Sequence, residues 1–207
     1  MNKEFPETLV CDNGIVLDKI SIYQAEEKLE VIKGNVDYIS EFGIWPPKDY
    51  DMAKEEEYVK NCLEGWDNGE RFDYAIFDEE DIFIGSFAVV VLSQKLAKYE
   101  LNYWIRQDYQ AKGIMTKVLK TITDFLFEDP FPANKVIIRM IAKNIKSAKV
   151  ATKCGYLLES KHFDEELSSL KGGLGDSLIF VRLRDKKKHK KLEKMQKELK
   201  KLYGLEK

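Results

Sequence analysis

The junction between Lys112 and Gly113 is the part of the sequence best suited to bind an anion. The pattern predicts a strand before it, over residues 97–105, and a helix directly after it, over residues 113–127. The first turn of a helix has N–H groups without intrahelical partners at its positive end, so it attracts phosphate groups. Gly113 would let an anion approach the backbone closely, and Lys112 would add a cationic donor. Because strand–glycine–helix junctions are common, this feature alone does not define a site.

Two well-known phosphate-binding motifs do not occur in the sequence. There is no G-x-x-x-x-G-K-[ST] segment, so a P-loop NTPase is not indicated. The cluster Gly172-Gly173-Leu174-Gly175 lacks the glycine spacing of a dinucleotide-binding fold and precedes a strand-like run, not a helix. We predict that this cluster forms a hairpin loop.

Three further polar residues could contribute to a site: Glu100, Asn144 and Ser147. Residues 145–154 predict a short helix that ends at Gly155, the glycine expected just after a helix. Asn144 is a good N-cap residue for it, and Ser147 lies in its first turn, where a hydroxyl is ordinary. Glu100 is also explained as an acidic side chain on a strand face near solvent. Structural roles therefore account for all three residues unless other features tie them to a ligand.

The elements that must position these residues form an α/β (α+β) pattern. The predicted order is a strand, two helices, antiparallel strands, a helix, a strand, a helix and final strands. This order indicates a mixed, mostly antiparallel central sheet with helices on both faces. The nearly continuous apolar run over residues 135–141 is typical of a strand buried on both sides. The other strands are predicted at residues 15–20, 72–77, 82–92, 156–158 and 177–183. The other helices are predicted at residues 24–40 and 51–67.

An aromatic, proline-containing loop follows the first predicted helix, at residues 42–47. Pro46 and Pro47 remove backbone donors and fix φ, so the loop is expected to be rigid. Trp45 could either cover the core or form a wall of a substrate groove, and the sequence leaves both interpretations open.

The composition indicates a soluble, cytoplasmic protein without a metal site. The chain has 207 residues, of which 44% are hydrophobic and 34% charged, enough for one core under a charged surface. The N-terminal residues lack a secretory signal pattern, and no apolar run approaches the roughly 20 residues that span a bilayer. Three widely spaced cysteines and two histidines suggest neither a disulfide framework nor a metal cluster.

The net charge of −2 hides an asymmetry along the chain. We expect residues 1–184 to form one domain, and residues 185–207, with a net charge of +6, to form a basic helical extension. The extension carries an apolar stripe at helical spacing: Leu192, Met195, Leu199 and Leu202. Docking of this stripe on its own domain is the favoured interpretation. Contact with a second copy in a homodimer, or binding of the basic tail to ribosomal RNA, remains open.

Taken together, the polar segments resemble the GCN5-related N-acetyltransferase (GNAT) superfamily, over about residues 10–184. Gln110-Ala111-Lys112-Gly113-Ile114-Met115 is similar to its pyrophosphate loop, Q/R-x-x-G-x-G/A. It departs from that pattern at Met115, where a small residue is usual. The departure is mild, because the N–H groups and not the side chains would hold the phosphates.

The later segments resemble one branch of this superfamily, the ribosomal-protein N-terminal acetyltransferases. Members of this branch, the Rim type, acetylate N-terminal serine or alanine. Asn144-x-x-Ser147 with Gly155-Tyr156 is similar to their pattern, and residues 100–105 resemble their fourth strand. The resemblance therefore implies that acetyl-CoA is a cosubstrate and that a primary amine is the acceptor.

The resemblance also implies which residues would bind acetyl-CoA. Backbone groups of Tyr103, Trp104 and Ile105 would pair with the pantetheine arm, in a splay between the fourth and fifth strands. Asn144 would contact the pantetheine. Backbone N–H groups from one continuous segment would cradle the pyrophosphate: Gln110, Ala111, Lys112, Gly113, Ile114, Met115 and Thr116.

Two catalytic roles follow from the same resemblance. Ser147 would protonate the departing thiolate, and Glu100 would act as the base, directly or through water. In many members of the superfamily a tyrosine four residues before the glycine–aromatic pair is the acid. Ala151 occupies that position here, so Ser147 is the only motif candidate.

The acceptor is best interpreted as an amine of low pKa. An α-amine with a pKa near 8 costs only about 1.4 kcal/mol to present neutral at pH 7, whereas a lysine side chain costs about 4.6 kcal/mol. A site with one carboxylate therefore suits a protein N-terminus. A polyamine or an antibiotic amine stays open as the acceptor, because the acidic domain would attract a cation. A non-catalytic acyl-CoA-binding module is the alternative of another class.

Overall fold

The computed structural model describes residues 5–42, 46–47, 49–128, 132–167 and 173–205. Its centre is an eight-stranded sheet in the order β1-β2-β3-β4-β5-β6-β8-β7. The strands are β1 (Thr8–Val10), β2 (Val16–Lys19), β3 (Arg71–Phe77), β4 (Phe83–Ser93), β5 (Lys98–Ile105), β6 (Lys135–Ile141), β7 (Leu157–Leu167) and β8 (Leu174–Leu183). The helices are α1 (Ala25–Gly34), α2 (Val36–Ile39), α3 (Met52–Asp67), α4 (Ile114–Phe127), α5 (Ile145–Lys153) and α6 (Lys186–Leu202). The predicted mixed, mostly antiparallel α+β fold is confirmed.

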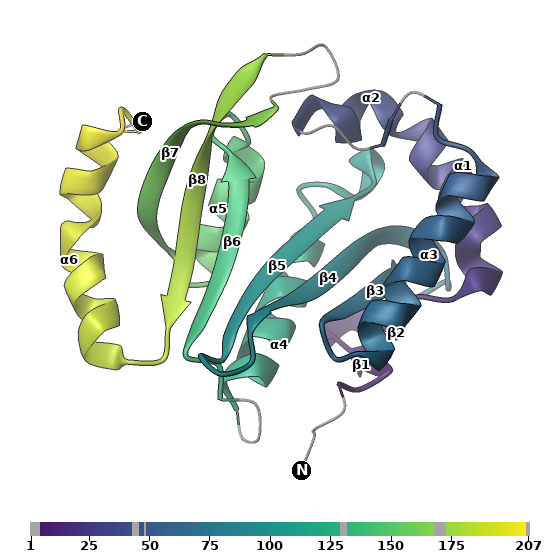
Figure 1. Cartoon of the computed structure of the whole chain (residues 1–207), viewed down its shortest axis with the longest axis horizontal. Helices are drawn as coiled ribbons and strands as arrows, with labels where there is room; N and C mark the ends of the chain where they lie inside the picture. Colours follow the sequence, from purple (N-terminus) through teal and green to yellow (C-terminus); the bar gives the residue numbers. More distant parts are fainter. Residues whose placement is uncertain (1–4, 43–45, 48, 129–131, 168–172, 206–207) are drawn as a thin grey trace.

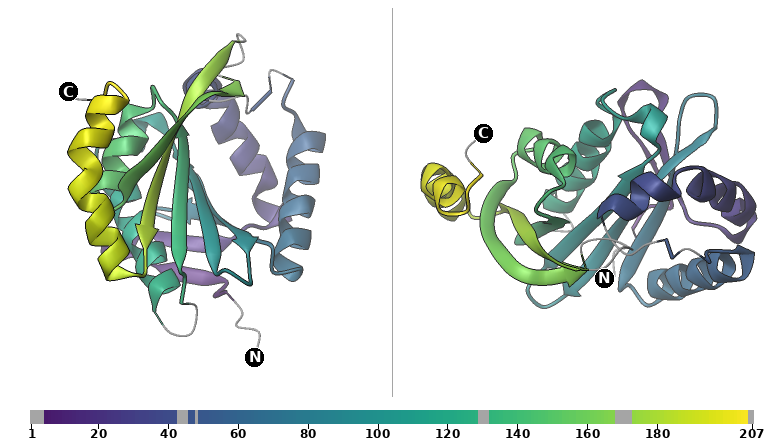
Figure 2. Two further views of the ribbon diagram at one scale, coloured as in Figure 1. Left: turned by 60° about the vertical axis from the view of Figure 1, so that its left-hand side comes forward. Right: turned by 90° about the horizontal axis from the view of Figure 1, so that it is seen from above.

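Helices cover both faces of this sheet (Figures 1 and 2). The amphipathic helix α4 buries Val118, Leu119 and Ile122 against one face, where they meet Leu101 of β5 and Ile138 of β6. On the other face, α1 and α3 are linked by a buried ion pair between Lys28 and Glu55, whose Nζ and Oε1 lie 2.6 Å apart. The opposite faces of β5 therefore meet different surroundings.

The sheet consists of two antiparallel parts that meet at the parallel pair of β5 and β6. Register pairs join these two strands only from Lys98–Lys135 to Glu100–Ile137. β5 stays paired with β4 as far as Ile105, and β6 stays paired with β8 along its whole length. Beyond Glu100 the two strands diverge, and Figure 1 shows their carboxyl ends splayed apart. The splay expected between residues 97–105 and 135–141 is therefore present.

The helix predicted over residues 24–40 is two helices with a break at Asn35. Asn35 has φ −121° and ψ 9°, which is not helical, and its N–H bonds to the carbonyl of Ile32. Its side chain accepts a hydrogen bond at 3.0 Å from the N–H of Gln107, in the short 3-10 turn (Gln107–Tyr109) after β5. The spacing of hydrophobic residues continues through Asn35 and gives no sign of this break. The break is associated with a hydrogen bond to Gln107, which is distant in sequence.

The last two strands are longer than predicted, and a short first strand was missed. β7 extends ten residues beyond Leu157, where the sequence predicted an end at Leu158. Register shifts near Ser160 and between His162 and Glu166 disturb the alternation of side chains, so the pattern did not resemble a strand. Leu174 and Gly175 belong to β8, so the hairpin-loop prediction was wrong for them; Gly172 and Trp45 lie outside the described residues.

Helix α6 lies along the outer edge of the sheet, beside β7 (Figure 1). Gln196 accepts a hydrogen bond from the N–H of Leu158 and donates one to its carbonyl, both at 2.9 Å. Leu192 and Leu199 pack on the domain, whereas Leu202 is 74% exposed. The predicted docking of the apolar stripe on its own domain is therefore confirmed for Leu192 and Leu199 but not for Leu202. In the part of the chain that the structure describes, no helix is long and apolar enough to cross a membrane.

At Gly85 of β4, the backbones of β4 and β5 approach each other closely. A Cβ built on it would lie 2.4 Å from the carbonyl oxygen of Trp104 and 2.9 Å from Cα of Ile105. Both atoms belong to backbone and cannot move independently of β5. Only a residue without a side chain at Gly85 allows the end of β5 to lie this close to β4. This end of β5 borders the splay.

We predict that Gly85→Ala lowers the free energy of unfolding by about 1–3 kcal/mol, because the methyl group must push β5 away. Chemical denaturation measures this change. Gly34→Ala is the matched control, since a Cβ there meets nothing within 4 Å, and it should leave stability unchanged or raise it by up to about 1 kcal/mol. Equal stability of Gly85→Ala and the unsubstituted chain would contradict the predicted close approach.

Candidate active site

A cavity of about 940 Å³ lies at the splay between β5 and β6. Its size is within the range of small-molecule sites in proteins. Tyr103 and Leu101 line it from the face covered by α4, and Glu100 and Asn102 line it from the opposite face. Successive side chains of a strand point to opposite faces, so the cavity reaches both sides of the sheet through the gap. Two reactants could therefore enter it from different directions.

The start of α4 forms an array of backbone N–H groups at one end of this cavity. Gly113, its N-cap residue, has φ +79°, and no side chain of the described residues caps the helix. Ala111 also has a positive φ, 60°, which is unusual for a residue with a side chain and is typical of functional loops. Left-handed residues in a loop turn neighbouring N–H groups to one side and create anion-binding concavities. The loop and the first turn of α4 are thus suited to bind phosphate groups.

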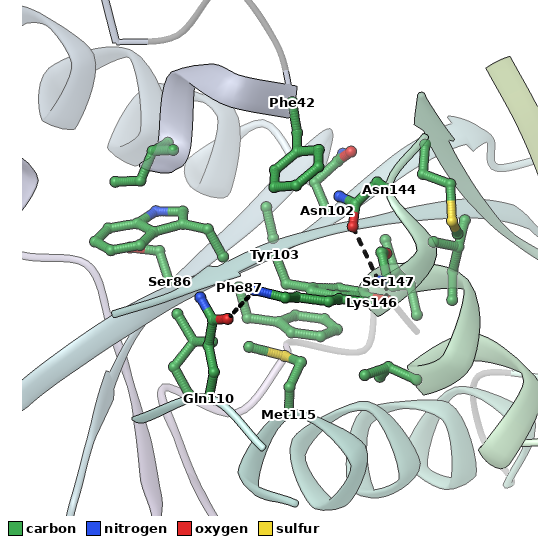
Figure 3. A pocket seen from close by; sticks show the side chains of 18 of the residues that line it. Phe42, Ser86, Phe87, Asn102, Tyr103, Gln110, Met115, Asn144, Lys146 and Ser147 are labelled. Atoms are coloured by element: carbon green, nitrogen blue, oxygen red, sulfur yellow. Dashed lines mark hydrogen bonds between the residues drawn. The ribbon is translucent and has the colours of Figure 1, made fainter. Parts of the chain in front are cut away.

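Met115 occupies the position at which the resemblance implies a small residue. Its side chain is 6% exposed and packs in the main hydrophobic core, below Phe87 in Figure 3. The departure from the pattern thus leaves the first-turn N–H groups accessible, because the bulk of Met115 points into the core.

Lysine side chains surround the same part of the cavity. Lys146, Lys149 and Lys153 of α5 follow one another at spacings of three and four, and all three line the cavity. The ammonium of Lys146 donates to Oε1 of Gln110 at 2.8 Å (Figure 3). This row of cations was missed by the sequence analysis, although its helical spacing could have suggested it.

Lys112 is the one predicted site residue that does not line the cavity. Its ammonium lies 4.4 Å from the ring centre of Tyr109, a cation–π contact. The other predicted site residues all border the cavity: Glu100, Tyr103, Trp104, Ile105, Gln110, Ala111, Gly113, Ile114, Met115, Thr116, Asn144 and Ser147. The topology therefore brings together segments that are far apart in the sequence.

Asn144 and Ser147 begin α5 at the carboxyl end of β6. The side-chain oxygen of Asn144 accepts a hydrogen bond from the N–H of Ser147 at 3.0 Å, so Asn144 is the N-cap (Figure 3). This cap fixes the first turn of α5 and with it the position of the Ser147 hydroxyl in the cavity wall. The capping role that the sequence suggested is therefore present, and it also orders the candidate acid.

Tyr103 contributes a second hydroxyl, which the sequence analysis did not consider. Its phenol oxygen lies 3.0 Å from Oγ of Ser147, and its ring stacks on Phe87 with centres 5.8 Å apart. Burial raises the pKa of Tyr103 to about 12. The resemblance had pointed to the backbone of this residue, and no local pattern indicates that its side chain would reach a helix 44 residues further along.

Charged side chains surround Glu100 on the opposite face. Nε of Arg139 lies 4.0 Å from Oε2 of Glu100, and its NH1 group donates to Glu165 at 3.0 Å. His162 and Ser177 also contact Glu165, and these hydrogen bonds lower the pKa of Glu165 to about 2. A carboxyl group of so low a pKa accepts a proton poorly at neutral pH. Glu100 borders the cavity and Glu165 does not, so Glu100 is the better candidate base.

Within the described ranges, no three histidine, cysteine, aspartate or glutamate side chains lie close enough together to hold a metal ion.

We predict that Asn144→Ala lowers the free energy of unfolding by about 1 kcal/mol, because the N-cap is lost. Asn144→Asp is the matched variant, since its carboxylate can still accept the hydrogen bond, and its stability should stay near that of the unsubstituted chain. If the Asn144 amide also contacts the pantetheine, acetyl-CoA affinity measured by calorimetry should fall in both variants. Full affinity in Asn144→Asp would mean that Asn144 serves only as a cap.

Comparison with known proteins supports this interpretation of the cavity. Residues 16–157 match the family model described as an acetyltransferase (GNAT) domain. The probable N-acetyltransferase YjcK of Bacillus subtilis (strain 168) is 21% identical over 145 residues, which are 69% of this chain and 80% of that protein. The putative ribosomal N-acetyltransferase YdaF of the same organism is 32% identical over 80 residues, 39% of this chain and 43% of YdaF.

Solved structures show the same fold. RimL, a ribosomal L7/L12 alpha-N-protein acetyltransferase in complex with coenzyme A, superposes with a TM-score of 0.80 at 17% identity, covering 86% of this chain and 98% of RimL. The microcin C7 self-immunity acetyltransferase MccE, in complex with acetyl-CoA and AMP, has a TM-score of 0.78 at 20% identity, covering 86% and 97%. Because the family model spans more than half of the chain and includes the cavity-forming strands, the chain belongs to the GNAT family of acetyl-CoA-dependent N-acetyltransferases.

Proposed function

We propose that this enzyme acetylates the N-terminal amine of a protein, with acetyl-CoA and the acceptor bound together. The observation that carries the proposal is the cavity that reaches both faces of the sheet at the splay. The N–H groups and lysines suited to phosphate lie on the side of α4 and α5, and the candidate base, Glu100, lies on the other side. A donor and an acceptor that enter from opposite faces would meet at the gap, so no acyl-enzyme is needed.

Acetyl-CoA fits the groups on the α4 side. Its pyrophosphate matches the N–H groups from Gln110 to Thr116, and its remaining phosphate could be held by the lysine row of α5. Its extended pantetheine amides suit the diverging edge of β5 at residues 103–105. When bound, acetyl-CoA supplies an acetyl group that is activated by a thiol leaving group.

The remaining chemistry is a transfer of protons on two sides of the sheet. Glu100, directly or through water, would take the proton that the amine loses. Ser147 would give its hydroxyl proton to the departing sulfur and regain one from solvent when the products leave. Orientation of the two substrates in the gap, and donors that polarise the thioester carbonyl, would supply most of the acceleration.

The acceptor class follows from acidity and from the relatives. An α-amine needs little help to lose its proton, which suits a site with Glu100 as its candidate base. Two proteins that this chain resembles also point to such an acceptor. RimL is described as a ribosomal L7/L12 alpha-N-protein acetyltransferase, and YdaF as a putative ribosomal N-acetyltransferase. We place the reaction in the cytoplasm, since Cys11, Cys62 and Cys154 are buried and unpaired, as is usual in reducing compartments.

The similarity to MccE supports a second candidate acceptor, a small-molecule amine. Arg71 and Asp73, joined by two hydrogen bonds of 2.6 and 2.7 Å, line the cavity on the acceptor side. Such a fixed polar wall could recognise a compact polar acceptor as well as a peptide. Turnover with each class of acceptor distinguishes the two candidates.

We predict that thiol release from acetyl-CoA is at least about tenfold faster, as kcat/KM, with peptides bearing a free N-terminal serine or alanine than with spermidine or an aminoglycoside. The same peptides with a blocked N-terminus and an internal lysine are the control. Preference for the small amines would support the second candidate. Calorimetric binding of acetyl-CoA without thiol release from any amine would favour the non-catalytic alternative.

We predict that Glu100→Gln lowers kcat by about 10²–10⁴-fold at neutral pH and removes the acidic limb of the pH–rate profile, because the base is lost. Glu165→Gln is the matched control, since Glu165 contacts the same Arg139 but does not border the cavity. An equal loss in both variants would mean that Glu100 acts only through the position of Arg139.

A further inference from the structure

The hydroxyl groups of Tyr103 and Ser147 form a pair in the cavity wall, on the face where the thiol leaves. Their oxygens are 3.0 Å apart, and each hydroxyl has one proton to donate. No other described residue hydrogen-bonds either oxygen. The direction of this single bond therefore decides which hydroxyl proton points into the cavity.

The chemistry of the two hydroxyls favours donation from Tyr103 to Ser147. A phenol, with an ordinary pKa near 10, is a stronger acid than an aliphatic alcohol and so the better hydrogen-bond donor, whereas the alcohol oxygen is the better acceptor. Since burial raises the pKa of Tyr103 to about 12, this phenol keeps its proton throughout the working pH range. With the Ser147 oxygen occupied as an acceptor, its own proton is free for a third atom.

Packing holds the phenol in this place. The Tyr103 ring stacks on Phe87, with an angle of 13° between the ring planes, and Phe87 is 1% exposed (Figure 3). On the other side of the bond, Asn144 caps the first turn of α5 and fixes Ser147. Both partners are thus held by groups that do not need a ligand, so the pair is preorganised.

We infer that Tyr103 is a positioning residue for the leaving-group step, donating its hydrogen bond to Ser147 so that the Ser147 proton faces the sulfur. The inference rests on the proposed function and adds a residue to it. In the step, the carbon–sulfur bond breaks, the electron pair leaves on sulfur, and the proton moves from Ser147 Oγ to sulfur. As negative charge grows on Ser147 Oγ, the more acidic phenol passes its own proton along the same hydrogen bond, so the charge rests on the Tyr103 oxygen until solvent returns a proton when the products leave.

The test removes one hydroxyl at a time and measures kcat and KM with the best acceptor of the unsubstituted enzyme. We predict that Tyr103→Phe lowers kcat about 10–100-fold, as expected for loss of a hydrogen bond to a group that becomes charged, with the KM for acetyl-CoA within about twofold. Ser147→Ala should lower kcat further, and the double variant should be no slower than Ser147→Ala, because Tyr103 acts only through Ser147. The melting temperature should change little, since the Phe ring keeps the stack on Phe87.

Tyr99→Phe is the matched control, because Tyr99 lies on the same face of β5 but does not border the cavity, and it should keep full turnover. Tyr103→Phe with unchanged kcat would overturn the inference. Additive losses in the double variant, or Ser147→Ala with more activity than Tyr103→Phe, would instead make Tyr103 a donor to sulfur in its own right. If the unsubstituted enzyme releases no thiol with any amine, the proposed function fails before this comparison is made.

Discussion

The end of pairing between β5 and β6 is the constraint on which the rest of the structure depends. β5 is held along its length by β4, and β6 by β8, while three register pairs join the two halves of the sheet. Strands twist, so two halves joined so briefly must diverge. Both strands run in parallel, and each is followed by a helix, so α4 and α5 begin at the same end of the gap. One topological feature thus points two helix N-termini at one cavity, as is usual for ligand sites at the carboxyl ends of parallel strands.

In the proposed reaction, the sheet also separates the two proton transfers. Glu100 faces one side, within an ionic network that contains Arg139, whereas the next odd-numbered residues of β5 face the other side. A carboxylate and a hydroxyl pair placed on the same side could exchange protons with each other. The alternation along a single strand keeps them apart without any additional element.

Sequence reasoning was most successful where chemistry depends on the backbone. The strand–glycine–helix junction at Gly113, the cap at Asn144 and the buried strand over residues 135–141 follow from local rules of geometry and hydrophobicity. It was weakest where contacts are distant or strands irregular. The bulges of β7 hide its alternation, and the break at Asn35 depends on a hydrogen bond to Gln107. The lysine row of α5 was visible in the spacing, yet only the cavity gives it a meaning.

Packing explains why Ala151 occupies the position at which many members of the superfamily have a tyrosine. Ser147 and Ala151 are four residues apart on α5, so they share a helix face, and Ala151 is 0% exposed within the main core. A tyrosine at that position would have to displace packed neighbours before its hydroxyl could reach the cavity. Tyr103 brings a phenol from β5 to within 3.0 Å of Ser147 Oγ, and its ring stacks on Phe87. The core therefore packs tightly against the small side chain of Ala151 on α5. The second hydroxyl of the site comes from Tyr103 on β5.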